Sequence, residues 1–457
     1  MKTWNQLFVR HGWRLMEERE NVFSFVNETK ENMQFLEECL EKADVEFECD
    51  GLSLFLEGEA ISETEWIRIL DYPERGRGGN LWFEPGKEEP IVRELDTYIC
   101  GIVRQLNRLG FYTNGCCDGH GRRRPNISFT ANGKCVTKLQ VILEVLRMDD
   151  FHIREHRQGY SISLPMNQSQ LLDIAEKLSL VEENWLDEGT EFIKEQFFYH
   201  LIEQLLSILG ASGNEGRVRE FVQETLAPFV DHISVDRSGN LLAEKKYRTG
   251  HGPTILLNAH LDLADELVPG RVLVKEDGIW SSSDGILGAD DRAGVAVLLH
   301  TAQQLASSSF SGKVKFIFTV KEEIGLVGAR NVDDYFLWGT DAAIVVDRRG
   351  KGDIVTSCRG YIPFCDEAYG RFFEKIAEEK DLTGWKCTEG GSSDTRIWAE
   401  HGIQSVNLSA GYQNEHTVDE YVDVKACYQT AKLVQSIFEH TRELREVLRE
   451  IRRVRVS

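Results

Sequence analysis

A chain of 457 residues is too long for one ordinary hydrophobic core, so we expect two or three domains. Its 75 acidic residues outnumber the 53 basic ones and give a net charge of -22, which argues against nucleic acid and anionic membrane surfaces as partners. The N-terminus has no apolar leader, no segment approaches the roughly 18 apolar residues of a membrane span, and the ten cysteines are scattered, so we expect a cytoplasmic protein with reduced thiols.

Residues 1–190 alternate between helical and strand-like patterns, which predicts an α+β module of one or two subdomains. Asp50-Gly51 is a hairpin signal, Gly110 is a helix-ending glycine, and Asn114-Gly115 is a turn signal. A loop rich in Gly, Arg and Pro is expected at residues 73–90. The expected elements are helix 15–43, strands 45–49 and 52–56, helix 91–109, strands 111–113 and 127–129, helix 136–147 and strand 160–164.

One segment of this module, Cys116-Cys117-Asp118-Gly119-His120, invites a metal or redox interpretation. Its Cys and His spacing matches no standard zinc motif, so the sequence favours a tight glycine-rich turn instead. Arg122-Arg123-Arg124 follows directly and would suit a phosphate or a carboxylate, but a solvated basic loop is the favoured interpretation.

From residue 195 onward, strands and helices alternate, which predicts an α/β domain with helices on the faces of a sheet. The expected elements are helices 197–209 and 216–226, strands 233–235, 241–243, 254–258, 314–320, 342–346 and 405–408, and a final helix 424–452.

Several of these strands end in residues that bind metals. In an α/β sheet, loops at the carboxyl ends of the strands converge on the ligand site. Each acid or histidine taken alone is most often a helix cap or a solvated loop residue. Together they supply two imidazoles and at least three carboxylates, the ligand mix of a two-zinc site. The candidates are His260, Asp262, Asp290, Asp291, Glu322, Glu323, Asp347 and His416.

Three motifs point to a known family. They are Leu287-Gly288-Ala289-Asp290-Asp291-Arg292-Ala293-Gly294, Gly390-Gly391-Ser392-Ser393-Asp394 and Gly411-Tyr412-Gln413-Asn414-Glu415-His416. With them, residues 196–440 resemble the catalytic domain of the co-catalytic dizinc metallopeptidases, the group that contains peptidase T, the glutamyl and leucyl aminopeptidases and the carboxypeptidase G relatives. The resemblance implies a zinc-peptidase domain at residues 195–457, with a mixed sheet flanked by helices. It does not cover residues 1–190.

The resemblance also implies a role for each candidate. Two zinc ions, replaceable by cobalt or manganese, are expected, with Glu322 as the general base. Asp262 lies two positions after His260 and is expected to accept its imidazole N–H and fix the tautomer. The implied metal ligands are His260 and Asp347 for one ion, Glu323 and His416 for the other, and Asp290 as the bridge.

The resemblance further implies a cis peptide at Asp290-Asp291, with Asp291 held by backbone amides or by Arg292. An aspartate at position 347 accompanies aminopeptidases and di- or tripeptidases, so small peptides are the expected substrates. Two alternatives remain: an N-acyl amino acid deacylase or carboxypeptidase on the same metals, and a binding or regulatory protein that keeps the fold without activity. The second alternative would lack a ligand or the base, and none is lacking here.

The spacing of the candidates leaves no room for the family's inserted domains. In relatives, an insert that provides the lid and the dimer surface lies either between the positions of Asp347 and His416 or between those of His260 and Asp290. Both intervals are too short for such an insert in this chain, so the oligomeric state stays open. We therefore expect residues 1–190 to form a substitute lid or a substrate-recognition module.

Overall fold

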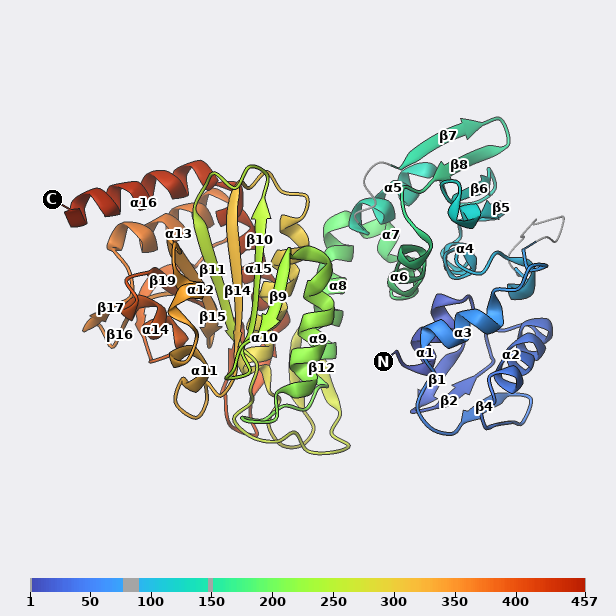
Figure 1. Cartoon of the computed structure of the whole chain (residues 1–457), viewed down its shortest axis with the longest axis horizontal. Coiled ribbons are helices and arrows are strands. Elements are labelled where there is room, and N and C mark those ends of the chain that lie inside the picture. Colours follow the sequence, from blue (N-terminus) through green and yellow to red (C-terminus); the bar gives the residue numbers. More distant parts are fainter. Residues whose placement is uncertain (1, 77–89, 147–150, 457) are drawn as a thin grey trace. The chain divides into compact units, whose positions relative to one another are not determined.

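Two separate hydrophobic cores divide the chain into the units Met1–Phe197 and Phe198–Ser457. The computed structural model describes residues 2–76, 90–146 and 151–456 (Figure 1), so most of the expected loop at 73–90 lies outside the described residues. Helix α8 (Thr190–Leu206) contributes Ile193 to the first core and Phe198 to the second. Across the three described ranges, every helix is too short or too polar to span a membrane.

The first unit contains two four-stranded antiparallel sheets. Their strand orders are β1-β2-β4-β3 and β5-β6-β8-β7. The strands are β1 (Met16–Arg19), β2 (Val22–Ser24), β3 (Phe47–Cys49), β4 (Ser53–Leu56), β5 (Thr113–Cys117), β6 (Asn126–Thr130), β7 (His152–His156) and β8 (Gly159–Ser163). The helices are α1 (Trp4–Arg10), α2 (Lys30–Lys42), α3 (Glu63–Leu70), η1 (Val92–Glu94), α4 (Cys100–Arg108), η2 (Gly119–Gly121), α5 (Val136–Val145), α6 (Gln168–Ser179) and α7 (Trp185–Glu188).

Three expectations for this unit were wrong in part. Residues 16–24 form a hairpin rather than the start of a helix; Asn21 turns the chain with a positive φ of 61°, and α2 begins only after Thr29, whose side chain caps it. The helix expected from residue 91 begins at Cys100, although Gly110 follows its end as predicted. Asn114-Gly115 lies within β5, where the register shifts as in a β-bulge.

The second unit is an α/β domain built on a nine-stranded mixed sheet, as expected. Its order is β17-β16-β19-β15-β11-β14-β10-β9, with β18 paired to β16. β11 runs parallel to β14 and β15, and β15 runs parallel to β19. The strands are β9 (His232–Val235), β10 (Leu241–Tyr247), β11 (Thr254–His260), β14 (Gly312–Thr319), β15 (Ala342–Arg348), β16 (Asp353–Cys358), β17 (Ile362–Pro363), β18 (Lys386–Gly390) and β19 (Gln404–Ser409).

Both faces of this sheet are covered, because its central strands are apolar on both sides. In β11, Ile255 and Leu257 enter the larger core with α10 (Ala289–Leu305) and α15 (Val424–Glu439), whereas Leu256 enters a smaller core with Trp398. A second sheet has the order β12-β13-β21-β20, from β12 (Leu273–Glu276), β13 (Ile279–Ser282), β20 (Tyr412–Gln413) and β21 (Tyr421–Asp423). The helices are α9 (Gly216–Leu226), η3 (Ala227–Phe229), α10 (Ala289–Leu305), α11 (Val327–Arg330), α12 (Asp334–Leu337), α13 (Glu367–Glu379), α14 (Asp394–Glu400), α15 (Val424–Glu439) and α16 (Thr441–Val456).

Candidate metal centre

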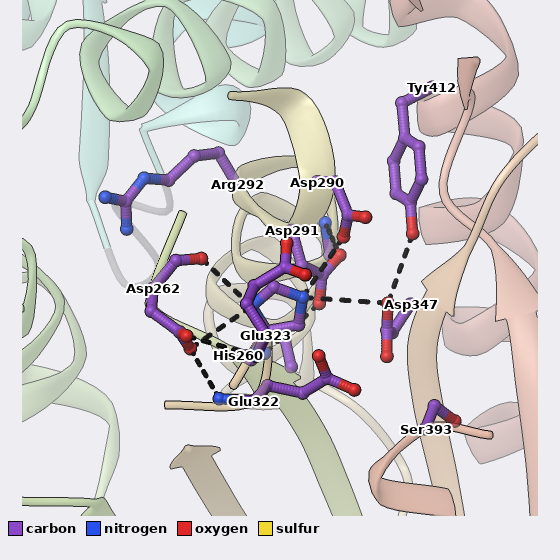
Figure 2. A network of polar contacts seen from close by, with 12 residues as sticks. His260, Asp262, Asp290, Asp291, Arg292, Glu322, Glu323, Asp347, Ser393 and Tyr412 are labelled. Atoms are coloured by element: carbon purple, nitrogen blue, oxygen red, sulfur yellow. Dashed lines mark hydrogen bonds and ion pairs between the residues drawn. The ribbon is translucent and has the colours of Figure 1, made fainter. Parts of the chain in front are cut away.

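Strands β11, β14 and β15 end at one edge of the large sheet, and each brings a candidate ligand to that edge. His260 is the last residue of β11, Glu323 follows β14, and Asp347 lies near the end of β15. Because these strands are parallel, their carboxyl ends meet. Asp290 lies in the first turn of α10, and His416 lies between β20 and β21. The structure therefore brings all five candidate ligands together; Figure 2 labels four of them.

Asp290 is shared by two groups of three side chains. In the first group, His260 Nε2 lies 3.1 Å from Asp290 Oδ1 and 3.8 Å from Asp347 Oδ1. In the second, His416 Nε2 lies 3.2 Å from Asp290 Oδ2 and 2.8 Å from Glu323 Oε1. Within each group the candidate ligand atoms all lie within 4.8 Å of one another. The two oxygens of Asp290 thus face different groups, which is the arrangement of a bridging carboxylate.

The donor atoms of this centre fit divalent metal ions. Carboxylate oxygens and imidazole nitrogens are ligands that Zn²⁺ and similar ions accept. The carboxylate side chains of Asp290, Glu323 and Asp347 are only 8–10% exposed. Burying this much negative charge is costly unless a cation compensates. The residues present therefore match a metal centre in both chemistry and burial.

The pKa values of the centre show the same need for a cation. Burial, together with the nearby charges of Asp394 and Glu323, raises the pKa of Glu322 to about 8, and burial raises the pKa of Asp347. Burial also opposes ionisation of Asp290, but hydrogen bonds from both histidines lower its pKa. Hydrogen bonds to Asp290 and Glu323 raise the pKa of His416 to about 10. The centre thus holds protons that a metal ion would displace.

The turn that carries Asp290 matches the expectation from the resemblance. The Asp290-Asp291 peptide is cis. The Asp291 carboxylate accepts hydrogen bonds from the backbone amides of His260 at 3.2 Å and Gly294 at 3.1 Å. Arg292 donates instead to the backbone oxygen of Leu261 at 2.6 Å. Of the two expected partners for Asp291, the backbone amides form its hydrogen bonds.

The buried carboxylate of Asp262 fixes the loop that carries the two glutamates. It accepts hydrogen bonds from the backbone amides of Glu322 at 2.9 Å and Glu323 at 3.2 Å, and from the Ser212 hydroxyl at 2.6 Å. Its Oδ1 lies 3.5 Å from His260 Nδ1, whereas the Asp262 backbone oxygen lies 3.0 Å from that nitrogen. The closer partner of the imidazole is therefore the carbonyl and not the expected carboxylate. Figure 2 shows the Glu322 carboxylate turned away from Asp262.

Glu420 is a supporting residue that the sequence did not predict. Its carboxylate accepts hydrogen bonds from three successive backbone amides at the start of α10: Gly288 at 2.7 Å, Ala289 at 2.8 Å and Asp290 at 3.0 Å. A carboxylate at a helix N-terminus accepts hydrogen bonds from amides that have no partner within the helix. Its negative charge also interacts favourably with the helix dipole. Glu420 thereby fixes the backbone of the candidate bridging residue.

Two further supporting residues, Tyr412 and Asp394, belong to motifs of the sequence analysis, which assigned them no role. Tyr412 donates its hydroxyl hydrogen to Asp347 Oδ1 at 3.1 Å. Asp394 is buried and accepts a hydrogen bond from Thr319 Oγ1 at 2.5 Å, while burial raises its pKa to about 6. Their position within these motifs was the feature of the sequence from which a role could have been predicted.

Parts of this chain are similar to known proteins. The sequence model of the M42 glutamyl aminopeptidases matches residues 283–433. The uncharacterised protein YqjE of Bacillus subtilis (strain 168) is 39% identical to this chain, over 44% of this chain and 84% of its own length. Two solved structures are similar to part of the chain. The aminopeptidase PepT from Bacillus cereus ATCC 10987 has a TM-score of 0.49 and 20% identity over 54% of this chain and 98% of its own. A tripeptidase from Staphylococcus aureus subsp. aureus mu50 has a TM-score of 0.47 and 18% identity, over 56% and 99%.

Proposed function

This chain belongs to the M42 glutamyl aminopeptidase family and is a peptidase, and we propose that it releases the N-terminal residue of small peptides with the help of two zinc ions. The observation that supports two ions is that the Asp290 oxygens face separate groups, one with His260 and one with His416. In the proposed centre His260 and Asp347 would hold one ion, Glu323 and His416 would hold the other, and Asp290 would contribute to both. Cobalt and manganese are the expected substitutes.

Glu322 is the proposed general base. Bound zinc would supply a water of lowered pKa and would polarise the scissile carbonyl. Glu322 accepts the proton of the attacking water and later donates it to the leaving amine. Asp262 holds the backbone amides of Glu322 and Glu323, so that each of the two neighbouring side chains keeps its own direction.

Replacing Glu322 tests this assignment. The Glu322→Gln variant keeps the size of the side chain and removes the base, so turnover should fall by about 10²- to 10⁴-fold. The metal content, measured by elemental analysis, should stay at two ions because Glu322 is not one of the proposed ligands. Glu378→Gln, an exposed change on α13, is the control and should keep full activity. Unchanged turnover in Glu322→Gln would remove Glu322 from the mechanism.

A panel of substrates tests the reaction itself. Peptides with a free N-terminus and the same peptides with an acetylated N-terminus would be assayed with zinc, cobalt and manganese. An aminopeptidase or a di- or tripeptidase should cleave only the free peptides and release the N-terminal residue. Preference for the acetylated series would favour the deacylase alternative, and release of the C-terminal residue would favour the carboxypeptidase alternative.

We assign substrate recognition to the first unit, residues 1–190. The support is that the second unit contains all the proposed ligands and the base, but the intervals His260 to Asp290 and Asp347 to His416 have no room for the inserts that form the lid in relatives. The first unit has its own core, and the five proposed ligands are all residues of the second unit.

A further inference from the structure

The first unit contains its own group of metal-binding side chains. Cys117 ends β5, Asp118 and His120 follow in the turn at η2, and Asp96 comes from the segment between η1 and α4. One candidate ligand atom from each of these four residues lies within 4.8 Å of the other three. Side chains from two separate segments thus converge, which the Cys and His spacing alone could not reveal.

Hydrogen bonds hold this group in place. The Asp118 amide donates to Asp96 Oδ2 at 3.1 Å, and the His120 amide donates to Asp118 Oδ1 at 2.8 Å. His120 has a left-handed backbone, with φ 49° and ψ 35°. Its Nδ1 lies 3.3 Å from Asp118 Oδ1, and its Nε2 lies 3.9 Å from Asp96 Oδ2. The imidazole therefore presents one nitrogen to Asp118 and the other to Asp96.

The carboxylates of this group are buried, and a bound cation would stabilise them. Asp96 and Asp118 are only 7% and 4% exposed. Within the described part of the chain, the exposed imidazole of His120 is the basic group that pairs with them, and the three arginines that follow it are exposed to solvent. Two buried carboxylates beside a thiol are costly without a positive charge between them.

We propose that this group binds one divalent transition-metal ion of the zinc class. The proposed ligands are Asp96 Oδ2, Cys117 Sγ and His120 Nε2, and the thiol loses its proton to solvent on binding. Asp118 accepts the Nδ1 hydrogen of His120 and fixes the tautomer that leaves Nε2 free for the metal. The thiolate excludes calcium and magnesium, which prefer oxygen ligands.

A cobalt titration distinguishes this site from the peptidase centre, because the five proposed ligands there include no cysteine. The full-length chain, stripped with a chelator, would be titrated with Co²⁺ while the thiolate-to-cobalt charge-transfer absorption is recorded. The absorption should correspond to one cobalt ion per chain at saturation and should persist in Asp290→Asn, which disrupts the peptidase centre. Failure of the two-zinc proposal would therefore leave this result unchanged. A saturated chain without the absorption would overturn the proposal.

Variants identify the thiol and the imidazole. Cys117→Ser should abolish the absorption, whereas Cys135→Ser, an exposed thiol of the same unit, should preserve it. His120 is 67% exposed, so His120→Ala should fold normally and bind cobalt at least tenfold more weakly. Asp118→Asn should weaken binding by about 10- to 100-fold, as expected for a residue that orients a ligand. Persistence of the absorption in Cys117→Ser, or unchanged affinity in His120→Ala, would contradict the proposal.

Discussion

Asp262 shows how one side chain positions two neighbouring glutamates without being a ligand. Its two oxygens accept three hydrogen bonds, from Ser212 and from the amides of Glu322 and Glu323. An asparagine has only one carbonyl oxygen, and its NH₂ group would face donors on the other side. A buried donor without an acceptor costs about 1–3 kcal/mol. The Asp262 position therefore requires a carboxylate and not merely a polar side chain of the same shape.

The Asp262→Asn variant should therefore weaken the metal centre while leaving the chain folded. We expect a loss of metal affinity of about 10- to 100-fold, the usual effect of removing a group that orients ligands. Competition with a chromogenic chelator measures this affinity. Ser212→Ala is the matched control, because it removes one of the three hydrogen bonds and leaves both glutamate amides bound to Asp262, so its effect should be below tenfold. Equal effects of the two variants would contradict this role.

The candidate ligands could be predicted because each stands beside a strong local signal. His260 and Asp347 follow or end buried apolar strands, and Asp290 lies in a glycine-framed turn before an apolar helix. Glu420 could not be predicted, because it acts on amides about 130 positions earlier in the chain. Asp96 could not be predicted for the same reason: it precedes α4, whereas its partners lie beyond that helix, at the end of β5 and in the turn that follows.

At the scale of elements, the close approach of α10 to the sheet depends on Gly294. A Cβ atom at this position would lie 2.0 Å from the backbone oxygen of Val346 in β15 and 2.3 Å from Asp291 Oδ1. Contacts this short require the helix or the strand to move. Gly294 therefore links the position of α10 to the aspartate turn at the metal centre.

Gly294→Ala should consequently destabilise the second unit and disturb the metal centre. We expect a loss of about 1–3 kcal/mol in the free energy of unfolding, as for other overpacked cores, together with reduced metal content. Gly216→Ala is the control. Gly216 begins α9 and a Cβ there would meet no atom within 4 Å, so alanine should raise stability by up to about 1 kcal/mol. Denaturant unfolding measures the free energy of unfolding of both variants. Equal stability of the two variants would exclude the proposed close approach.

The central strands of the nine-stranded sheet could be predicted from sequence more accurately than the elements of the first unit, whereas strands such as β16, β17 and β18 were not predicted. Strands such as β11 and β15 are short apolar runs buried on both faces, so their composition alone marks them. β1 has the exposed sequence Met16–Arg19 and carries no apolar alternation, so its sequence favours a helix. β5 contains Asn-Gly in a bulge, where the same dipeptide normally marks a turn.

At the scale of the whole molecule, the proposed recognition role of the first unit can be tested by truncation. A chain that begins at Gly189 keeps α8 whole and contains all five candidate ligands. It should retain the metal ions of the peptidase centre but differ from the full chain in its relative activity on short and longer peptides. Kinetics on dipeptides, tripeptides and longer peptides measure this preference. An identical preference in the truncated chain would remove the recognition role.

The protonation of the centre makes the stability of the metal-free chain depend on pH. Glu322 binds its proton more tightly in the folded state, with a pKa of about 8 against an ordinary 4.5, so its contribution is present below pH 4.5 and is lost as the pH rises towards 8. His416 acts in the same direction, from its ordinary 6.5 up to about 10. The lowered pKa of Asp290 gives a contribution to stability that is fully present above pH 3.8. The metal-free chain should therefore lose stability between pH 4.5 and 8.

Zinc should oppose this loss, because its ligands bind it only after losing their protons. At a free zinc concentration of 100 times the dissociation constant, the ion adds about 2.7 kcal/mol to the stability. We expect the gap in unfolding temperature between zinc-loaded and metal-free chain to widen as the pH rises towards 10, because the proposed ligand His416 must lose its proton and its pKa is raised to about 10. The difference between the two unfolding temperatures cancels the pH-dependent contributions of ionisable groups elsewhere in the chain. One such group is the buried His11, whose pKa is lowered by burial. Glu322→Gln should reduce the pH dependence of the stability of the metal-free chain, because His416 continues to contribute. A temperature gap that stays constant with pH would mean that zinc displaces no protons.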